Sequence, residues 1–570
     1  MARENDDNDI SDTLIFRLHE SAPKVVREVL LERGWEEFDE DHQSEEEWNL
    51  HWRTSAFRTA DHNNVKPWQR LNHHPGTAQM IKKDCLARHL KRMKGIYGSS
   101  YYEFSPTAFI LPNDYTKFLA EFSKERHKKK ASYWICKPTD MSRGRGIFVF
   151  QDIKDLTYDC TVIVQKYITN PLLISGYKFD LRIYVCVTCF CPLTVYVYQE
   201  GLVRFATEKF SLSSLDNIFA HLTNTSINKY STSYLSDKER VGSGCKWTLG
   251  QFRSYLRSVE IDDVLLWQRI YNIVTMTLLA IAPSVPQCPN CFELFGFDIL
   301  IDDTLKPWLL EVNYSPALSL DCPNDVTVKK RLINDIIDLL NYKSTEVQKY
   351  KSKKAKTFSP VLHSARQQML QRNNTSLQNS KEFKKGNPIR SSHLKENSDQ
   401  LTSSSSLLDK NEETKSPTKD GFVDCSNCNS EEKSSTESND DPVNKEILSG
   451  GKTIVSPRKT LTSKLRERMN ISPRQVASKV PPVSFASRAT SESYRTPRTV
   501  QWKYMECPLF PLYYISDVDE MPPAHVGDFL LIFPFNKTSL LASKTGSNVK
   551  SIIQEISKLT QRNLMEIKVT

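Results

Sequence analysis

The chain has 570 residues, of which 39% are hydrophobic and 25% are charged, and its formal net charge is +9. This length suffices for two or three domains, but the hydrophobic share excludes a chain that is globular from end to end. The opening stretch MARENDDNDISDT is polar and acidic, which argues against a secretory signal peptide. The 13 cysteines lack the spacing of a disulfide framework, so we expect a reducing, cytosolic environment.

Composition divides the chain into three parts. Residues 1–343 are rich in aromatic and β-branched residues. Within this part, residues 1–47 form a polar and acidic N-terminal segment. From 344 to 500 Ser, Lys, Asn, Thr and Glu dominate. Such a stretch cannot bury enough apolar surface to offset its ordering entropy, and we predict that it is disordered. Apolar patterning returns in a short C-terminal element over 506–570, with VGDFLLIFPFN and the helical pattern SNVKSIIQEISKL. We expect this element to dock as a small unit or to pack back on the core.

Positive charge gathers in three runs, at 88–94 (RHLKRMK), 124–130 (KERHKKK) and 341–356 (NYKSTEVQKYKSKKAK). Nucleic acid, an anionic membrane and an acidic protein surface are all compatible with such runs, and each run can also be a solvated face. The runs lack the interleaved aromatic residues on which bases stack, so nucleic acid is the weakest of these partners.

Residues 133–150, YWICKPTDMSRGRGIFVF, predict a strand, a loop and a second strand. Gly144 and Gly146 allow a backbone to approach a phosphate closely, and Arg143 and Arg145 add matching charge. A flexible basic hairpin loop is the alternative. The GxxxxGK[ST] spacing of a Walker loop is absent.

Two further strands are predicted downstream. TVIVQKYI (161–168) reads as a buried strand that ends in Gln165 and Lys166, and an edge strand with polar side chains can offer backbone groups to a flat base. In YKFDLRIYV, Lys178, Asp180 and Arg182 alternate with apolar residues, so one strand face is apolar and the other holds three charges. This alternation fits either a half-solvated strand or a pocket for phosphates and a carboxylate.

The longest apolar run, IYNIVTMTLLAIAP (270–283), is shorter than a membrane span and predicts a core helix. The chain also holds two CxxC pairs, Cys288/Cys291 and Cys425/Cys428. These pairs lie far apart and the second falls in the predicted disordered stretch, so they do not predict a zinc site.

FELFGFDILIDDTLKPWLLEVNYSP (292–316) predicts two strands joined by the loop 303–306, with Asp302 opposite Pro307. In that register Asp298 faces Glu311, and the two-residue strand period puts Asn313 on the same face as Glu311. Facing like charges are unfavourable unless something lies between them. Two carboxylates and an amide oxygen suit Mg²⁺, whereas two solvent-exposed acids are the plainer alternative.

These pieces occur in one order: Lys137-Pro, SRGRGI, QKYI, KFDLR, LVRFATEKF, HLTNTSINK, FGFDILID and LLEVNYSP. That order resembles the tubulin tyrosine ligase-like family over about residues 48–343. The resemblance implies an α/β (α+β) chain with an ATP-grasp fold. Residues 48–130 would be its amino-terminal α/β and linker portion, and 131–343 its catalytic core.

Within the family the chain is most similar to the polyglutamylases. The resemblance implies an ATP- and Mg²⁺-dependent ligase that adds glutamate, through an acylphosphate, to the γ-carboxylate of glutamates in acidic tubulin tails. Glycine or tyrosine as the donor, or a catalytically silent microtubule-binding protein, are the alternatives. The implied partners are tubulin or microtubules, bound by the cationic stretch 341–356, and free glutamate, with no nucleic acid or membrane. The protein would be a monomer in the cytoplasm, on the microtubule cytoskeleton, or in a cilium or basal body.

The resemblance also assigns residues. For ATP it implies Lys83, Lys137, Ser142, Arg143, Gly144, Arg145, Gly146, Ile147, Gln165, Lys166, Tyr167, Ile168, Lys178, Asp180, Thr223 and Asn224. For the incoming amino acid it implies Arg204, Ser226, Lys246 and Lys330, and for the metal ion Asp298, Glu311 and Asn313. It gives Arg204, Lys178 and Asp180 a direct part in catalysis. Thr225 and Tyr314 occupy positions that differ among relatives, so initiation versus elongation and the choice of α- or β-tubulin stay open.

Overall fold

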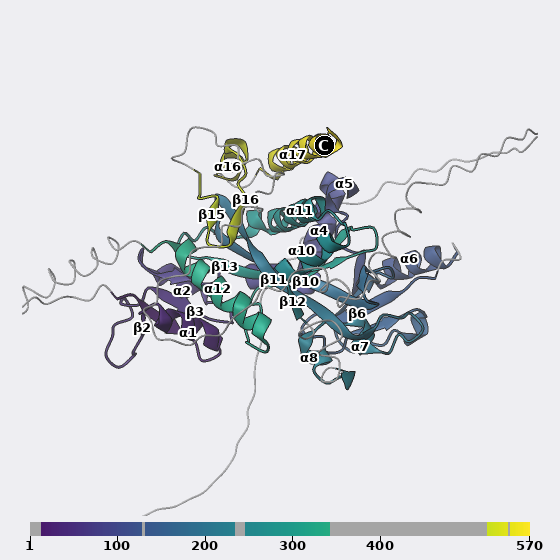
Figure 1. Cartoon of the computed structure of the whole chain (residues 1–570), viewed down its shortest axis with the longest axis horizontal. Coiled ribbons are helices and arrows are strands. Elements are labelled where there is room, and N and C mark those ends of the chain that lie inside the picture. Colours follow the sequence, from purple (N-terminus) through teal and green to yellow (C-terminus); the bar gives the residue numbers. More distant parts are fainter. Residues whose placement is uncertain (1–12, 128–130, 234–245, 343–520, 545–547, 570) are drawn as a thin grey trace, which may run out of the picture. The chain divides into compact units, whose positions relative to one another are not determined.

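The computed structural model (Figure 1) describes residues 13–127, 131–233, 246–342, 521–544 and 548–569, without the side chains beyond residue 561. The predicted disordered stretch 344–500 and the Cys425/Cys428 pair lie outside the described residues. So do residues 343–356 of the cationic stretch and residues 506–520 of the C-terminal element.

A small parallel sheet opens the described chain, in the order β2-β1-β3-β4. Helix α1 packs on helix α12 (Pro323–Leu340) through a buried stripe that includes Val25, Val26 and Val29, which is the one-sided pattern of a surface helix. The elements of this portion are β1 (Ile15–Leu18), α1 (Lys24–Glu32), β2 (Glu36–Glu37), β3 (Leu50–Trp52), α2 (Thr59–Asn64), β4 (Arg70–Leu71), α3 (Thr77–Met80), α4 (Lys83–Tyr97) and α5 (Ser99–Tyr102).

An antiparallel four-stranded sheet follows, in the order β5-β8-β6-β7. One of its faces is covered by α6, whose Phe118 is fully buried against Trp134. The other face is turned toward Leu222 and Ile227. The elements are β5 (Ala108–Leu111), α6 (Tyr115–His127), β6 (Trp134–Pro138), β7 (Phe148–Phe150), the 3₁₀ turn η1 (Ile153–Asp155) and β8 (Val162–Lys166).

The central sheet has the order β14-β13-β10-β11-β16-β15, with β9 beside β10 and β12 beside β11. Its strands are β9 (Leu173–Ile174), β10 (Tyr177–Phe190), β11 (Leu193–Lys209), β12 (Lys246–Thr248), β13 (Glu293–Ile301), β14 (Pro307–Asn313), β15 (His525–Val526) and β16 (Phe529–Phe533). The helices after β11 are α7 (Ile218–His221), α8 (Thr225–Asn228), α10 (Leu249–Ser258), α11 (Val264–Ile281), the 3₁₀ turn η2 (Ala282–Ser284), α12 (Pro323–Leu340), α16 (Lys537–Lys544) and α17 (Val549–Val569).

The two faces of the central sheet have different chemistry because strand side chains alternate. Phe179, Leu181 and Ile183 of β10 belong to the core that includes α10 and α11. On the opposite face, Lys178, Asp180 and Arg182 come first, and Tyr184 and Cys186 then join the core beneath α1 and α12. All three charged residues are at most 8% exposed, so the alternative of a half-solvated strand is wrong.

The prediction that the apolar run 270–283 is too short to span a membrane is wrong in one respect, because helix α11 is longer than that run. Together with η2 it forms, among the described residues, one segment (Val264–Ser284) long and apolar enough to cross a bilayer. However, 78% of its most apolar window is buried inside the protein. It is therefore placed as a core helix, as predicted.

The β13–β14 hairpin places Asp298 opposite Glu311, as predicted, but by a different route. Ile301, rather than Asp302, pairs with Pro307, because the Asp302 carboxylate closes the turn by accepting hydrogen bonds from Thr304 and Lys306. A β-bulge between Asp298 and Ile299 then restores the facing register, with one extra residue in β14. The two differences cancel, and the acids still meet.

The C-terminal element completes the central sheet, because β16 pairs with β11. Gly527 has φ +55 and lies so close to the Asp335 carboxylate that an added Cβ would be 2.3 Å from it. The Asp528 amide donates to that carboxylate at 2.8 Å. Ile552, Ile553 and Ile556 of α17 join the same core as α11.

Substituting Phe529 with alanine tests whether β16 is an integral strand. Phe529 is fully buried, with its ring 4.9 Å from that of Tyr198. We expect Phe529→Ala to lower the free energy of unfolding by about 3–5 kcal/mol, from lost burial and the cavity left behind. Leu541→Ala, at a residue 52% exposed on α16, should change it by less than about 0.5 kcal/mol. Equal effects in chemical denaturation would contradict this docking of the C-terminal element.

Candidate active site

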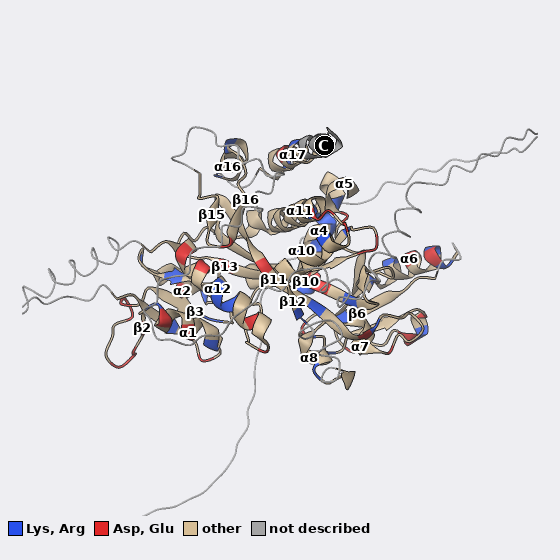
Figure 2. Cartoon of the chain, viewed as in Figure 1, with Lys and Arg blue, Asp and Glu red and all other residues tan. Residues whose placement is uncertain are grey.

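A cavity of about 120 Å³ lies where the four-stranded antiparallel sheet meets the charged face of the central sheet. Figure 2 shows basic and acidic residues close together in this region, around β10, β12 and β6. The predicted site residues that line the cavity are Lys83, Lys137, Ser142, Arg143, Gly144, Ile147, Gln165, Lys166, Tyr167, Ile168, Lys178, Asp180, Arg204, Thr223, Asn224, Asp298, Glu311 and Asn313. Eight separate stretches of chain are thereby brought to one place.

Four charged side chains from three strands form a buried network at this cavity. The Arg204 guanidinium donates to both oxygens of Asp180, at 2.7 and 2.6 Å, and its Nη2 also lies 2.8 Å from Asp298 Oδ2. Arg182 donates to both oxygens of Asp298, at 2.6 and 3.1 Å. Thr223 adds a hydrogen bond to Asp180 at 2.6 Å. Two-pronged pairing of this kind fixes the direction in which each carboxylate points.

Strand register produces this network. Asp180 of β10 pairs with Arg204 of β11, and Arg182 of β10 pairs with Asp298 of β13, so opposite charges face each other across both ladders. Burial alone would raise the pKa of Asp298, but Arg182 and Arg204 outweigh it and hold that pKa well below its usual range. Asp298 is therefore ionised although it is buried.

Glu311 has a different environment from Asp298. Burial, and then the neighbouring Asp298, raise the pKa of Glu311, and no ion pair to it forms within the described part of the chain. The Asn313 amide lies 3.3 Å from Glu311 Oε1 and 3.4 Å from Asp298 Oδ2. Its oxygen and nitrogen exchange places on a half-turn, so the amide oxygen can face the same point. Two carboxylates and an amide lie close together here, and the nearby positive charge does not neutralise both carboxylates. Such a set of oxygen ligands fits a hard divalent cation.

Two lysines enter the cavity from opposite sheets. Lys137 of β6 donates to Gln165 at 2.8 Å, and burial lowers the pKa of Lys137 to about 8. Lys178 of β10 donates to the Tyr167 hydroxyl at 2.9 Å and to the His221 carbonyl at 2.7 Å. Burial lowers the pKa of Lys178 to about 7. Both ammonium groups lose contact with water in this cavity. An anionic ligand would replace that lost solvation with ion pairs.

The loop that contains Gly144 packs against helix α8. Gly144 has φ +79, and a Cβ added there would lie 2.3 Å from Ile227 Cδ1, so the close approach requires glycine. Arg143 has φ 63, and its carbonyl accepts a hydrogen bond from Ser226 at 2.9 Å. Lys83 donates to the Met141 carbonyl at 2.7 Å. The loop is thus held over the cavity from two sides.

Five predicted site residues are not among those that line the cavity: Arg145, Gly146, Ser226, Lys246 and Lys330. Lys246 is buried beside the network, where it pairs with Asp325 at 2.7 Å. Lys330 points away, because its ammonium pairs with Glu32 at 2.8 Å and Glu28 at 3.5 Å on α1. These acids hold Lys330 on the side of α12 that faces α1.

The sequence placed Arg182 on a charged strand face but assigned it no partner, and it gave no role to His221. The alternation in KFDLR places Arg182 on the charged face, but only strand pairing shows that its partner is Asp298, 116 residues away. His221 Nδ1 lies 2.8 Å from the Tyr167 hydroxyl, and nothing in the sequence signals this contact. Met141, Leu300 and Leu310 supply apolar lining.

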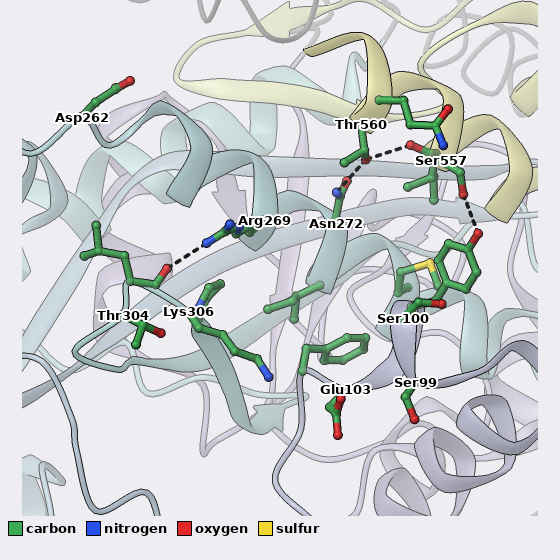
Figure 3. A pocket seen from close by; sticks show the side chains of 18 of the residues that line it. Ser99, Ser100, Glu103, Asp262, Arg269, Asn272, Thr304, Lys306, Ser557 and Thr560 are labelled. Atoms are coloured by element: carbon green, nitrogen blue, oxygen red, sulfur yellow. Dashed lines mark hydrogen bonds between the residues drawn. The ribbon is translucent and has the colours of Figure 1, made fainter. Parts of the chain in front are cut away.

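A larger cavity, of about 1230 Å³, lies between α5, α11, the β13–β14 turn and α17 (Figure 3). Ser557 donates to the Tyr101 hydroxyl at 3.1 Å, and Asn272 donates to Thr560 at 3.4 Å, so α17 is fastened to both helices there. None of the predicted site residues line this cavity among the described residues. We therefore place the candidate active site in the smaller, charged cavity.

Comparison with known proteins gives close relatives over nearly the whole length. The chain is 47% identical to the probable tubulin polyglutamylase TTLL2 of Homo sapiens over 567 residues, which covers 99% of this chain and 87% of the relative. The probable tubulin polyglutamylase TTLL2 of Mus musculus is also 47% identical, over 96% of this chain and 92% of the relative. Tubulin polyglutamylase TTLL5 of Mus musculus is 37% identical over 58% of this chain and 25% of its own length.

The profile of the tubulin-tyrosine ligase family matches residues 59–354, which include the four-stranded antiparallel sheet and the central sheet apart from β15 and β16. Together with the 47% identity to relatives that the chain covers almost completely, this match establishes the family. The chain is a member of the tubulin-tyrosine ligase family.

Proposed function

We propose that this chain is a tubulin polyglutamylase with an ATP-grasp catalytic core. It would use ATP and Mg²⁺ to join free glutamate to the γ-carboxylate of glutamates in acidic tubulin tails. The names of its relatives support the substrate and the reaction. The buried network of Asp180, Arg182, Arg204 and Asp298, which ends at the Glu311 carboxylate, is the observation that carries the proposal, because it prepares a charged cavity for a polyphosphate and a metal ion.

ATP is proposed to bind between the two sheets. Because β8 lies between β5 and β6 and is not an edge strand, Gln165 to Ile168 would meet the adenine at the end of β8, while Lys137 and Lys178 meet the phosphates from opposite sides. The loop backbone around Gly144 would also approach the phosphates. The cavity of about 120 Å³ is smaller than a typical ligand pocket of roughly 300–1,000 Å³, so we expect this loop to move outward when nucleotide enters.

Asp298, Glu311 and Asn313 are proposed to hold Mg²⁺. Bound there, the ion would neutralise phosphate charge and orient the transferred phosphoryl group. Arg182 would keep Asp298 ionised and aimed into the cavity, so we assign it as a positioning residue. Transfer of the γ-phosphoryl group to the acceptor carboxylate would release ADP and give an acylphosphate, and the amine of the incoming glutamate would then form the amide bond and displace inorganic phosphate. Positioning and charge neutralisation suffice for both steps without a protein nucleophile.

Arg204 is proposed to bind the carboxylate of the incoming glutamate. Its Nε and Nη2 already donate to Asp180 and Asp298, which leaves Nη1 as the nitrogen outside the described contacts. Lys246 lies opposite Arg204 in the β11–β12 ladder and would add positive charge next to it. Lys330 is omitted from this site, because its ammonium pairs with α1. Ser226 would act through the loop carbonyl that it holds.

The first test is incorporation of labelled amino acid into microtubules with ATP and Mg²⁺. Glutamate, glycine and tyrosine are supplied separately, and we expect incorporation of glutamate. Glu311→Gln should lower the rate by roughly 100-fold or more, because it removes the charge proposed to face the metal ion. Glu121→Gln, a matched change at a surface residue of α6 that pairs with Lys124, should leave the rate unchanged.

Each other outcome of this assay has a definite meaning. Incorporation of glycine or tyrosine would contradict the proposed donor. Salt-sensitive binding to microtubules without incorporation of any donor would identify a binding protein instead of a ligase. Full activity of Glu311→Gln would contradict the proposed metal site.

The second test is the pH dependence of ATP binding. With a pKa of about 7, Lys178 is mostly neutral above pH 7, whereas bound phosphates favour its protonated form. Binding should therefore take up a proton above pH 7, and the affinity should fall by up to about tenfold per pH unit. Lys137, with a pKa of about 8, should add a second fall above pH 8.

Lys178→Arg separates the two contributions, because arginine keeps its charge at every pH of the experiment. Calorimetric titrations should show that this variant loses the fall that begins near pH 7 and keeps only the fall above about pH 8 that comes from Lys137, which is less steep than the combined fall of the unmodified protein. Lys209→Arg, at an exposed position at the end of β11, should behave as the unmodified protein. An unchanged pH profile in Lys178→Arg would mean that Lys178 does not contact the nucleotide.

A further inference from the structure

Three metal-ligating side chains converge at a point outside the proposed active site. His62 comes from helix α2, and Cys288 and Cys291 come from the turn that precedes β13. One ligand atom from each residue lies within 4.8 Å of the other two. Cys291 Sγ is 3.1 Å from Cys288 Sγ and 3.5 Å from His62 Nδ1. Within the described part of the chain, this is the one group of at least three His, Cys, Asp or Glu side chains with such spacing.

The local backbone holds the two cysteines in this arrangement. The Cys291 amide donates to the Cys288 carbonyl at 3.4 Å and closes the CPNC turn. Asn290 fixes the turn to the small parallel sheet: its carbonyl accepts from the Leu71 amide at 2.9 Å, and its side chain donates to the Lys66 carbonyl at 2.6 Å. The cluster is therefore built on hydrogen-bonded backbone from two distant parts of the chain.

The imidazole is positioned independently. Its ring meets that of Phe57 edge to face, with centroids 5.8 Å apart. Cys291 is buried against an apolar cluster that includes Trp48 and Phe57, while Cys288 and His62 are partly exposed. The three ligands are therefore packed against apolar residues on one side and open to solvent on another.

We propose that His62, Cys288 and Cys291 bind a zinc ion. Two thiolates with two residues between them and one imidazole are three of the four ligands of common zinc sites, in which sulfur and nitrogen lie about 2.3 and 2.0–2.1 Å from the ion. Water would take the fourth position on the open side. The absence of a nearby second CxxC pair argued against zinc in the sequence, but the structure supplies a histidine 226 residues before Cys288 instead.

The alternative occupant of this cluster is a disulfide between the two cysteines. That bond would not require the imidazole, and a reducing compartment disfavours it. The convergence of three ligands from two elements favours the metal ion.

Zinc at this place would join the small parallel sheet to the central sheet. Cys291 is two residues before Glu293, whose buried carboxylate accepts hydrogen bonds from the His74 amide at 2.8 Å and the Thr77 hydroxyl at 2.7 Å. Glu293 is the first residue of β13, which carries Asp298. The ion would thus stabilise the start of the strand on which the active-site acid lies, without itself touching the reactants.

The test is zinc content of the purified full chain by mass spectrometry of the element. We expect about one zinc per chain, and a loss of about tenfold or more in Cys288→Ser and in Cys291→Ser. Cys160→Ser, at an exposed cysteine outside the cluster, should keep the zinc of the unmodified chain. Zinc at background level in the unmodified chain, or retained in both cluster variants, would overturn the proposal.

Buried Cys291 can fail to fold when it is replaced, so a second measurement uses the unmodified chain. Replacing zinc with Co²⁺ should give the sulfur-to-metal charge-transfer absorption of thiolate ligands and the visible bands of a tetrahedral ion. His62→Gln, at the partly exposed ligand, should weaken Co²⁺ binding and shift the visible bands. Absence of a charge-transfer band, or a Cys288–Cys291 disulfide in protein purified under reducing conditions, would exclude the metal site.

Discussion

Ion pairing in a buried cavity is the constraint on which the rest of this structure depends. Asp180, Arg182, Arg204 and Asp298 are all at most 8% exposed, and removing one partner of such a pair typically costs 3–5 kcal/mol. Each carboxylate must therefore be met by a guanidinium from a neighbouring strand. This requirement fixes the register of β11 and β13 on β10, and with it the direction of every functional side chain on the charged face.

The apolar face of the same sheet makes this arrangement stable. Phe179, Leu181 and Ile183 alternate with the charged residues and pack into the core with α10 and α11. The C-terminal strand β16 extends the sheet at β11, and α17 joins the same core. Residues that follow almost 180 undescribed positions thus help to hold a cavity whose lining residues all precede position 314.

The facing acids of the β13–β14 hairpin show how a site can retain uncompensated charge. Asp298 has two arginine partners, whereas Glu311 has none within the described chain, and its pKa is raised by burial and by Asp298. In the proposed ligase a metal ion would supply the missing positive charge, so the cost of facing like charges would be offset only with cofactor bound. The proposed zinc site lies at the beginning of the same strand but uses softer ligands, so the two ions would be kept apart by ligand chemistry.

The sequence by itself determined the features that are local in the chain. The two-residue period of KFDLR predicted the two faces of β10, and the hairpin pattern predicted that Asp298 faces Glu311, although the bulge in β14 was beyond its reach. Only the tertiary structure decided contacts between distant segments: Arg182 with Asp298, His62 with the CPNC turn, and Lys330 with α1 rather than the cavity. The physical reason is that periodicity fixes the face on which a side chain lies, whereas its partner depends on strand pairing and helix packing across more than a hundred residues.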